Sequence, residues 1–293
     1  MMGKGEKCLR RPKGFTLWHP VTGKSRGRRD FFWAEKAAWP AATLNRSLPD
    51  MPATSQNVRL LAVTPNALEL IYAAFRQCYH AGYAGDMWDG LVAGETPRDK
   101  QAAFVERILA SGHESPVEHV SFTFAIEGVS RTLTHQLVRH RIASYSQQSQ
   151  RYVDASDFDY VLPPSLAKIP EARARYEAFM AEAAACYREL QAMLEAKGRK
   201  GQTSNEDARF VLPGGVETKI VTTMNCRSLL HFFELRCCMR AQWEIRALAD
   251  RMLALCREAL PVIFATAGAK CERLGYCPES ERFSCGKYPV RRD

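Results

Sequence analysis

Residues 120–126 read VSFTFAI, and this short stretch decides the expected fold class. Its large apolar side chains, Phe122, Phe124 and Ile126, alternate with smaller ones. Because successive side chains of a β-strand point to opposite faces, this alternation predicts a strand with one buried face. The chain should therefore contain a sheet, and the flanking residues decide what covers it.

Helical patterns flank this strand on both sides. Upstream, apolar spacing predicts helices over residues 64–79, which Pro65 opens, and 97–111, which Gly112 ends. Few strands separated by helices predict a single α+β domain. The elements expected downstream are helices over 130–139, 170–198 and 205–211, short strands over 160–162 and 219–223, and one long helix from Cys226 to about Leu260.

Several common functional motifs are missing from the sequence. It contains no G-x-G-x-x-G, G-x4-G-K-[ST], H-E-x-x-H or G-x-S-x-G, which removes the usual support for dinucleotide-fold dehydrogenases, P-loop enzymes, zincins and α/β-hydrolases. No apolar stretch approaches the roughly 20 residues of a membrane span. We therefore expect no membrane partner, and any phosphate site must have another design.

The positive charge is concentrated at the N-terminus. The 293 residues include 41 Lys and Arg against 32 Asp and Glu, a formal net charge of +9, and residues 1–50 account for +7 of it, with eleven basic and four acidic residues. We expect residues 1–55 to be a basic, disordered extension. A native start at Met51 is one interpretation, a genuine tail or transit peptide a second, and an arm for nucleic acid a third. We expect no nucleic-acid partner.

Ten cysteines suggest either buried thiols or a disulfide scaffold. Three follow the pattern Cys271-x5-Cys277-x7-Cys285 within residues 267–293. These are either unligated thiols or three of four zinc ligands, and we expect no metal because no C-x2-C pair is present. Six other cysteines lie in apolar, helix-like contexts, so we expect them to be small buried side chains. Free thiols of this kind predict a reducing, cytoplasmic location. These cysteines are Cys78, Cys186, Cys226, Cys237, Cys238 and Cys256.

Residues 136–152 read QLVRHRIASYSQQSQRY and carry the strongest chemical signal. No acidic residue occurs between Glu127 and Asp154. Guanidinium, hydroxyl and amide groups without a carboxylate among them predict a pocket for an anion, with phosphate the natural candidate. A solvated basic helix end is the alternative. The arginines of this region are Arg131, Arg139, Arg141 and Arg151.

The run RHR-x7-S over residues 139–149, continued by RY at 151–152, resembles the signature of the flavin-dependent thymidylate synthases. The resemblance extends over about residues 58–265. Its other blocks match the family in order and spacing: GHESPVEH at 112–119 with FTF at 122–124, DARFVLP at 207–213, NCRSL at 225–229, LR at 235–236 and AQWEI at 241–245.

The resemblance implies the reductive methylation of dUMP to dTMP. In that family the one-carbon unit comes from 5,10-methylenetetrahydrofolate, and the hydride comes from FAD that NADPH has reduced. The resemblance also implies a small, mainly antiparallel sheet covered by long helices, and a homotetramer with active sites shared between subunits. The synthase domain would span residues 56–266, followed by the Cys-bearing segment 267–293. An arginine-rich pocket suits the phosphates of FAD and dUMP and the carboxylates of folate.

Ligand roles follow from the resemblance, position by position. The residues expected to contact FAD are Ser115, Arg139, His140, Arg141, Gln147, Asn225, Arg227 and His231. Those expected to hold dUMP are Gln136, Arg139, Gln147, Gln148, Ser149, Gln150, Arg151, Arg209 and Arg236. The chain departs from the family pattern at Gln147, where many members carry an acid, at His231, where Asn is common, and at Arg240, where some carry His. Each departure keeps a hydrogen-bonding group.

Arg236 is the expected catalytic residue, because a cation beside the uracil ring stabilises the negative charge that develops there. Ser149 is expected to contact a ligand rather than to act as a nucleophile. On a single long helix, Arg227 and His231 would share one face, and Arg236 would lie roughly opposite. The helical spacing also predicts an ion pair between Arg240 and Glu244.

Overall fold

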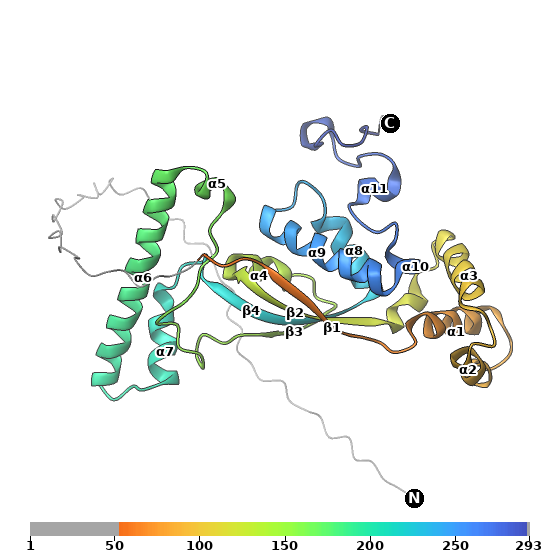
Figure 1. The fold of residues 1–293 in the computed structure, drawn as a ribbon, viewed down its shortest axis with the longest axis horizontal. Helices are drawn as coiled ribbons and strands as arrows, with labels where there is room; N and C mark the ends of the chain where they lie inside the picture. Colours follow the sequence, from red (N-terminus) through yellow and green to blue (C-terminus); the bar gives the residue numbers. More distant parts are fainter. Residues whose placement is uncertain (1–52, 292–293) are drawn as a thin grey trace, which may run out of the picture. The chain divides into compact units, whose positions relative to one another are not determined.

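The computed structural model describes residues 53–291, so most of the expected basic extension lies outside the described residues. At its centre is a four-stranded antiparallel sheet of order β1–β2–β4–β3 (Figure 1). The α+β class and the small antiparallel sheet are therefore confirmed for this part of the chain. The strands are β1 (Asn57–Val63), β2 (Ser121–Ser130), β3 (Ser144–Gln147) and β4 (Glu217–Asn225).

The pairing of β2 with β4 forms the middle of the sheet. Phe122 lies opposite Met224, and both side chains are buried. On the other face, the hydroxyls of Thr123 and Thr223 hydrogen-bond at 2.9 Å, and Val221 is exposed. The alternation predicted for residues 120–126 is confirmed, and one face of the sheet is open.

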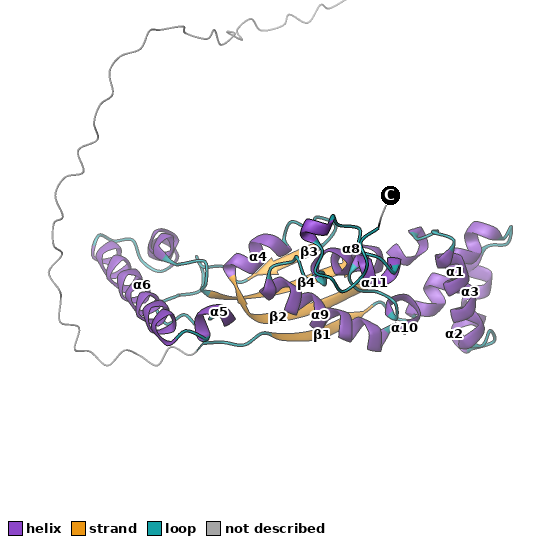
Figure 2. Cartoon of the chain, turned by 90° about the horizontal axis from the view of Figure 1, so that it is seen from above, coloured by secondary structure: helices purple, strands orange, loops and turns teal. Residues whose placement is uncertain are grey.

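Three helices cover the buried face: α8 (Cys226–Arg236), α9 (Trp243–Ala259) and α10 (Pro261–Phe264) (Figure 2). Helix α9 buries Ile245, Leu248 and Met252, whose spacing of three and four residues gives it one apolar side. From α10, the ring of Phe264 meets that of Phe122 edge to face, with centroids 5.5 Å apart. These contacts form the main core.

Further helices lie at the two ends of the sheet (Figure 1). At one end, α1 (Ala67–Tyr79), α2 (Ala84–Ala93) and α3 (Arg98–Ala110) pack together. At the other end, α6 (Pro170–Ala196) packs against α7 (Gln202–Ala208). The shorter helices are α4 (Arg131–Leu137), α5 (Pro164–Ala167) and α11 (Lys270–Leu274), with single turns η1 (Ser115–His119), η2 (Arg209–Val211) and η3 (Glu281–Phe283).

The single long helix expected over residues 226–260 is wrong, because the chain leaves the helical path between α8 and α9. Helix α9 has its own N-cap in Gln242. The side-chain oxygen of Gln242 accepts hydrogen bonds from the backbone N–H groups of Glu244 and Ile245, at 3.0 and 3.2 Å. A cap of this kind satisfies donors that a continuous helix would not leave free.

Glu244 has a different partner from the expected one. Its buried carboxylate accepts hydrogen bonds from the backbone N–H and the hydroxyl of Ser130, at 2.7 and 2.6 Å. Burial raises the pKa of Glu244, although the bonds from Ser130 oppose this shift. Arg240 lies in the break between the helices and pairs with Glu279. The expected Arg240–Glu244 pair is therefore wrong, and the start of α9 is tied to the start of α4.

Several elements lie where the sequence predicted none: the strands β1 and β3, the helix α2, and the short helical elements η1, α5, α10, α11 and η3. Conversely, the strand expected over residues 160–162 is reduced to isolated bridges of Tyr160 with Ala53 and Val216. The expected burial of the helical cysteines holds for Cys226 and Cys256 but is wrong for Cys78 and Cys186, which are exposed. No helix within residues 53–291 is both long and apolar enough to cross a membrane.

Candidate active site

A cavity of about 750 Å³ lies between the loop after α4, the end of β4 and helix α8. Most of its lining comes from residues 139–142 and 225–236, which the antiparallel pairing of β4 with β2 and β3 brings together, and Glu114, Glu118 and Arg273 complete it. We call this space the arginine–histidine cavity. Residues expected from the sequence that line it are Arg139, His140, Arg141, Asn225, Arg227, His231 and Arg236.

Asn225 connects this cavity to the start of α8. Its side-chain oxygen accepts a hydrogen bond from the backbone N–H of Ser228 at 2.8 Å, which is an N-cap. The cap occupies the amide oxygen, so the NH₂ group is the part of Asn225 that can donate to a ligand. In the same helix, Arg227 and His231 are four residues apart and line the same cavity, as predicted. Arg236, which was expected on the opposite face of a single long helix, lines this cavity as well.

His140 and Arg236 form a direct pair. The Nε of Arg236 lies 3.0 Å from the Nε2 of His140. Burial lowers the pKa of His140 to about 4, and the positive charges of Arg236 and His231 act in the same direction. The imidazole is therefore neutral near pH 7. Because a guanidinium can only donate, Nε2 must accept, and the ring proton resides on Nδ1.

The cavity also contains carboxylates, which the acid-free stretch of sequence did not reveal. Glu118 and, at 3.9 Å, Glu114 pair with Arg227. Glu234 of α8 accepts from Arg273 of α11 at 2.5 Å. The carboxylates of the cavity therefore pair with Arg227 and Arg273. Among the described residues, no carboxylate forms an ion pair with Arg139, Arg141 or Arg236, which also line the cavity.

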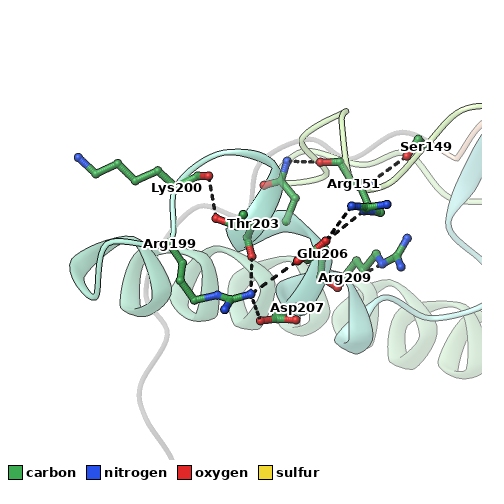
Figure 3. A network of polar contacts seen from close by, with 9 residues as sticks. Ser149, Arg151, Arg199, Lys200, Thr203, Glu206, Asp207 and Arg209 are labelled. Atoms are coloured by element: carbon green, nitrogen blue, oxygen red, sulfur yellow. Dashed lines mark hydrogen bonds and ion pairs between the residues drawn. The ribbon is translucent and has the colours of Figure 1, made fainter.

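A second group of predicted residues lies beside α7 (Figure 3). Arg151 forms an ion pair with Glu206 at 3.1 Å, and its backbone N–H donates to the hydroxyl of Ser149 at 3.2 Å. The Nε of Arg209 donates to the backbone carbonyl of Glu206, also at 3.2 Å. We call these four residues the α7 cluster. Arg151 and Arg209 do not line the arginine–histidine cavity, so within one chain the predicted site is in two parts.

Glu206 was missed at the level of sequence, and nothing in its surroundings distinguished it. It lies 55 residues from Arg151, and it also approaches Arg199 at 3.6 Å. Arg131 belongs to the acid-free region, but the sequence assigned it no ligand contact. Burial and then the charge of the neighbouring Arg209 lower the pKa of Arg131, so two arginines lie close together at this end of the sheet. The location of Arg131 in the acid-free region was the only signal.

The remaining predicted residues do not line the arginine–histidine cavity, and none is a member of the α7 cluster. Ser115, in η1, lines an adjoining cavity of about 660 Å³ beside Trp88. Gln147 donates to the hydroxyls of Thr134 and Thr218, at 3.0 and 3.3 Å. Gln148 lines a shallow hollow on the open face of the sheet. Gln136 lies on α4, and Gln150 lies in the loop that precedes Arg151. Their roles as ligand contacts stay predictions.

Guanidinium groups without ion-pair partners, beside a neutral imidazole and a capped helix start, are groups that phosphate-bearing ligands need. Such an arrangement is typical of the class of proteins that bind a nucleotide or a nucleotide-like cofactor.

The comparisons with known proteins make this class specific. The family model described as thymidylate synthase complementing protein matches residues 59–262. A flavin-dependent thymidylate synthase of Nitratidesulfovibrio vulgaris is 68% identical over 242 residues, covering 83% of this chain and 99% of that protein. Proteins of the same description from Clostridium tetani and Geobacter sulfurreducens are 45% and 46% identical, each over 78% of this chain and 93% and 94% of their own. The chain belongs to the flavin-dependent thymidylate synthase family.

Proposed function

We propose that this chain converts dUMP to dTMP, with 5,10-methylenetetrahydrofolate as carbon donor and with FAD, reduced by NADPH, as the source of hydride. Family membership supports the reaction. The observation that carries the proposal is the convergence of Arg139, Arg141 and Arg236 on one cavity, without ion-pair partners among the described residues. The residues within that cavity match the family signature at residues 139–141.

The donors of the cavity fit FAD. Its two phosphates need cations and N–H groups, which the side chains of Arg139 and Arg141 and the NH₂ group of Asn225 provide. When bound, FAD supplies the hydride. Arg227, held by Glu118, and His231 would contact it along α8, and the neutral His140 offers an Nδ1–H donor. Ser115 would extend the site toward η1, and Gln147, whose NH₂ group donates to Thr134 and Thr218, would offer its side-chain oxygen to the cofactor.

Arg236 is the proposed catalytic residue. As the uracil ring becomes nucleophilic, negative charge develops on it, and a fixed guanidinium beside the ring lowers the energy of that charge. The bond from Arg236 to His140 uses one N–H of its planar fork and restrains the orientation of the rest. The neutral state of His140 is what allows this bond, since a protonated imidazole would repel the guanidinium.

The α7 cluster is the proposed site for the phosphate of dUMP. Arg151 and Arg209 lie beside each other on Glu206, and a phosphate dianion would compete with that carboxylate for Arg151. The hydroxyl of Ser149 lies at the same place. Gln136, Gln148 and Gln150 complete the proposed contacts to the nucleotide, and Arg139 would reach both ligands.

We also propose a homotetramer in which the two parts of the site come from different subunits, in the cytoplasm. Three of the four most exposed large apolar side chains of the described residues are Phe210 at 83%, Ile142 at 75% and Tyr152 at 70%. Each is the sequence neighbour of a predicted ligand arginine. Exposed apolar side chains beside polar site residues are typical of a surface that another subunit covers.

Release of tritium from 5-tritiated dUMP tests the function directly. With methylenetetrahydrofolate and NADPH, we expect tritium release that depends on added FAD. A purified protein that shows no flavin absorbance, binds no FAD and releases no tritium would contradict the proposal.

A further inference from the structure

A second cavity, of about 680 Å³, lies between the α8–α9 break and the C-terminal segment that contains α11 and η3. It adjoins the arginine–histidine cavity, with which it shares Glu234, Leu235 and Arg236, but it differs from that cavity in containing thiols. Five of the nine cysteines in the described part of the chain line it: Cys237, Cys238, Cys271, Cys277 and Cys285.

Four of these cysteines reach the cavity from one position in the α8–α9 break and three positions in the C-terminal segment. The fifth, Cys237, is the C-cap of α8, and Asp250 of α9 lines the cavity with it. Cys271, at the start of α11, lines this cavity together with Cys238 and the buried Cys277. Cys285 lines the same cavity from the loop after η3. The spacing Cys271-x5-Cys277-x7-Cys285 left a fourth zinc ligand undefined, and the fold brings Cys238 to that place.

The backbone of the C-terminal segment closes on itself around Cys277. The N–H of Cys277 donates to the carbonyl of Pro289 at 2.7 Å, and the N–H of Arg291 donates to the carbonyl of Cys277 at 3.3 Å. This closure returns the loop that carries Cys285 to the neighbourhood of Cys277. Ligands that are distant in the sequence can thereby meet at one point.

The segment has little apolar burial to hold its fold. Among residues 270–291, Cys277 is the only buried residue. Two short helical elements and exposed ion pairs, such as Arg273 with Glu234 and Lys287 with Glu272, supply little stability in water. A segment with so little apolar burial usually depends on a disulfide or a metal, and the described cysteines form no disulfide.

The surrounding charge suits a thiolate metal centre. Six basic and four acidic side chains line the cavity. A zinc ion with four thiolates carries about two negative charges, which a surplus of two cations would balance. The cations are Arg236, Arg240, Arg246, Arg257, Lys270 and Lys287, and the acids are Glu234, Asp250, Glu272 and Glu279.

We propose that Cys238, Cys271, Cys277 and Cys285 bind one zinc ion as a closed four-thiolate site that fastens the C-terminal segment to the α8–α9 break. Zinc is the metal that tetrahedral sets of thiolates hold in structural sites. Within residues 53–291, no three His, Cys, Asp or Glu side chains are already grouped as metal ligands, so the thiols must turn toward one another on binding. Cys238 lies two residues after Arg236, and the site therefore fixes the end of α8.

Metal analysis of the full chain, purified under reducing conditions without chelator, tests this directly. We expect about one zinc ion per chain, released by a mercurial thiol reagent. Replacement of zinc by Co²⁺ should give the absorption bands of tetrahedral thiolate coordination. A wild-type protein that binds neither ion would overturn the proposal, as would iron as the bound metal. These readouts do not depend on thymidylate synthesis, and they remain valid if a variant fails to fold.

Cys238→Ser and Cys285→Ser should each lower the zinc content at least about tenfold. The matched controls are Cys78→Ser and Cys186→Ser, which replace exposed cysteines on α1 and α6 outside the cavity. The controls should keep the full zinc content. Zinc content in folded Cys238→Ser equal to that of the wild type would exclude the assigned ligand set.

Discussion

The guanidinium of Arg236 is oriented by its hydrogen bond to the imidazole of His140. Substitutions of Arg236 test the contribution of this guanidinium to catalysis. Arg236→Ala should lower kcat by about 10²–10³-fold, as does the loss of a group that stabilises developing charge. Arg236→Lys should restore only part of the loss, because an ammonium group lacks the planar fork.

Single-turnover kinetics with prebound FAD would measure the effect of these substitutions. Arg175→Ala removes an exposed cation of α6 that pairs weakly with Glu182, at 3.7 Å, and serves as the control. Unchanged turnover in Arg236→Ala would remove this residue from the mechanism.

The lowered pKa of His140 gives the protein a specific dependence on pH. An unfolded histidine has a pKa of about 6.5, whereas the pKa of His140 in the fold is about 4. Between these values the unfolded chain binds more protons, so the free energy of unfolding should fall as the pH falls from about 6.5 to about 4. Urea unfolding curves across this range would measure it.

His140→Asn should flatten this part of the pH profile, because it removes the titrating ring. His135→Asn replaces an exposed histidine on α4 and should leave the profile unchanged. If His140→Asn kept the full slope, another group would be responsible for it.

At the scale of elements, the bond between Glu244 and Ser130 joins α9 to the start of α4, which leads into residues 139–141. Glu244→Ala would leave the buried N–H and hydroxyl of Ser130 without their partner. We expect the free energy of unfolding to decrease by about 1–3 kcal/mol.

Chemical denaturation would give this value, and Glu258→Ala, an exposed substitution on the same helix, should change it by less than about 0.5 kcal/mol. Equal effects of the two substitutions would show that the buried bond contributes no net stability.

Local sequence patterns predicted the elements whose own residues determine them. Helices α1, α3 and α6 have clear apolar periodicity and glycine or proline boundaries, and the middle of β2 alternates strictly. Strand β3 was missed because its four residues, SYSQ, contain little apolar signal and are held by pairing with β4. The break after α8 was missed because residues 226–260 are helical in composition on both sides of it.

For the candidate active site, the sequence predicted the lining residues but not the residues that pair with them. Residues 139–141 and α8 supply the cavity as expected, since the signature is contiguous in sequence. Their partners could not be predicted, because Glu118 lies 109 residues from Arg227 and Glu206 lies 55 residues from Arg151. Such contacts are decided by the packing of whole elements rather than by local spacing.

At the scale of the whole molecule, the exposed Phe210 lies next to the predicted ligand Arg209. Phe210→Asp should dissociate the proposed tetramer and lower dTMP formation at least about tenfold, because a buried charge in an apolar interface is costly. Light scattering combined with the activity assay would detect both changes.

Tyr83→Asp replaces an exposed aromatic residue of similar size at the other end of the sheet, next to α2, and serves as the control. A wild-type protein that is monomeric and fully active would contradict the shared-site proposal.

The pairing of Thr123 with Thr223 spans 100 residues of chain. Loops of this length close slowly, so the central strands are expected to meet late in folding. A nascent chain that has emerged only as far as α6 exposes the apolar face of β2 without its partner β4 and without α8 to α10. Production of the protein should therefore be limited by aggregation of incomplete chains, and a lower expression level or a lower temperature should increase the folded yield.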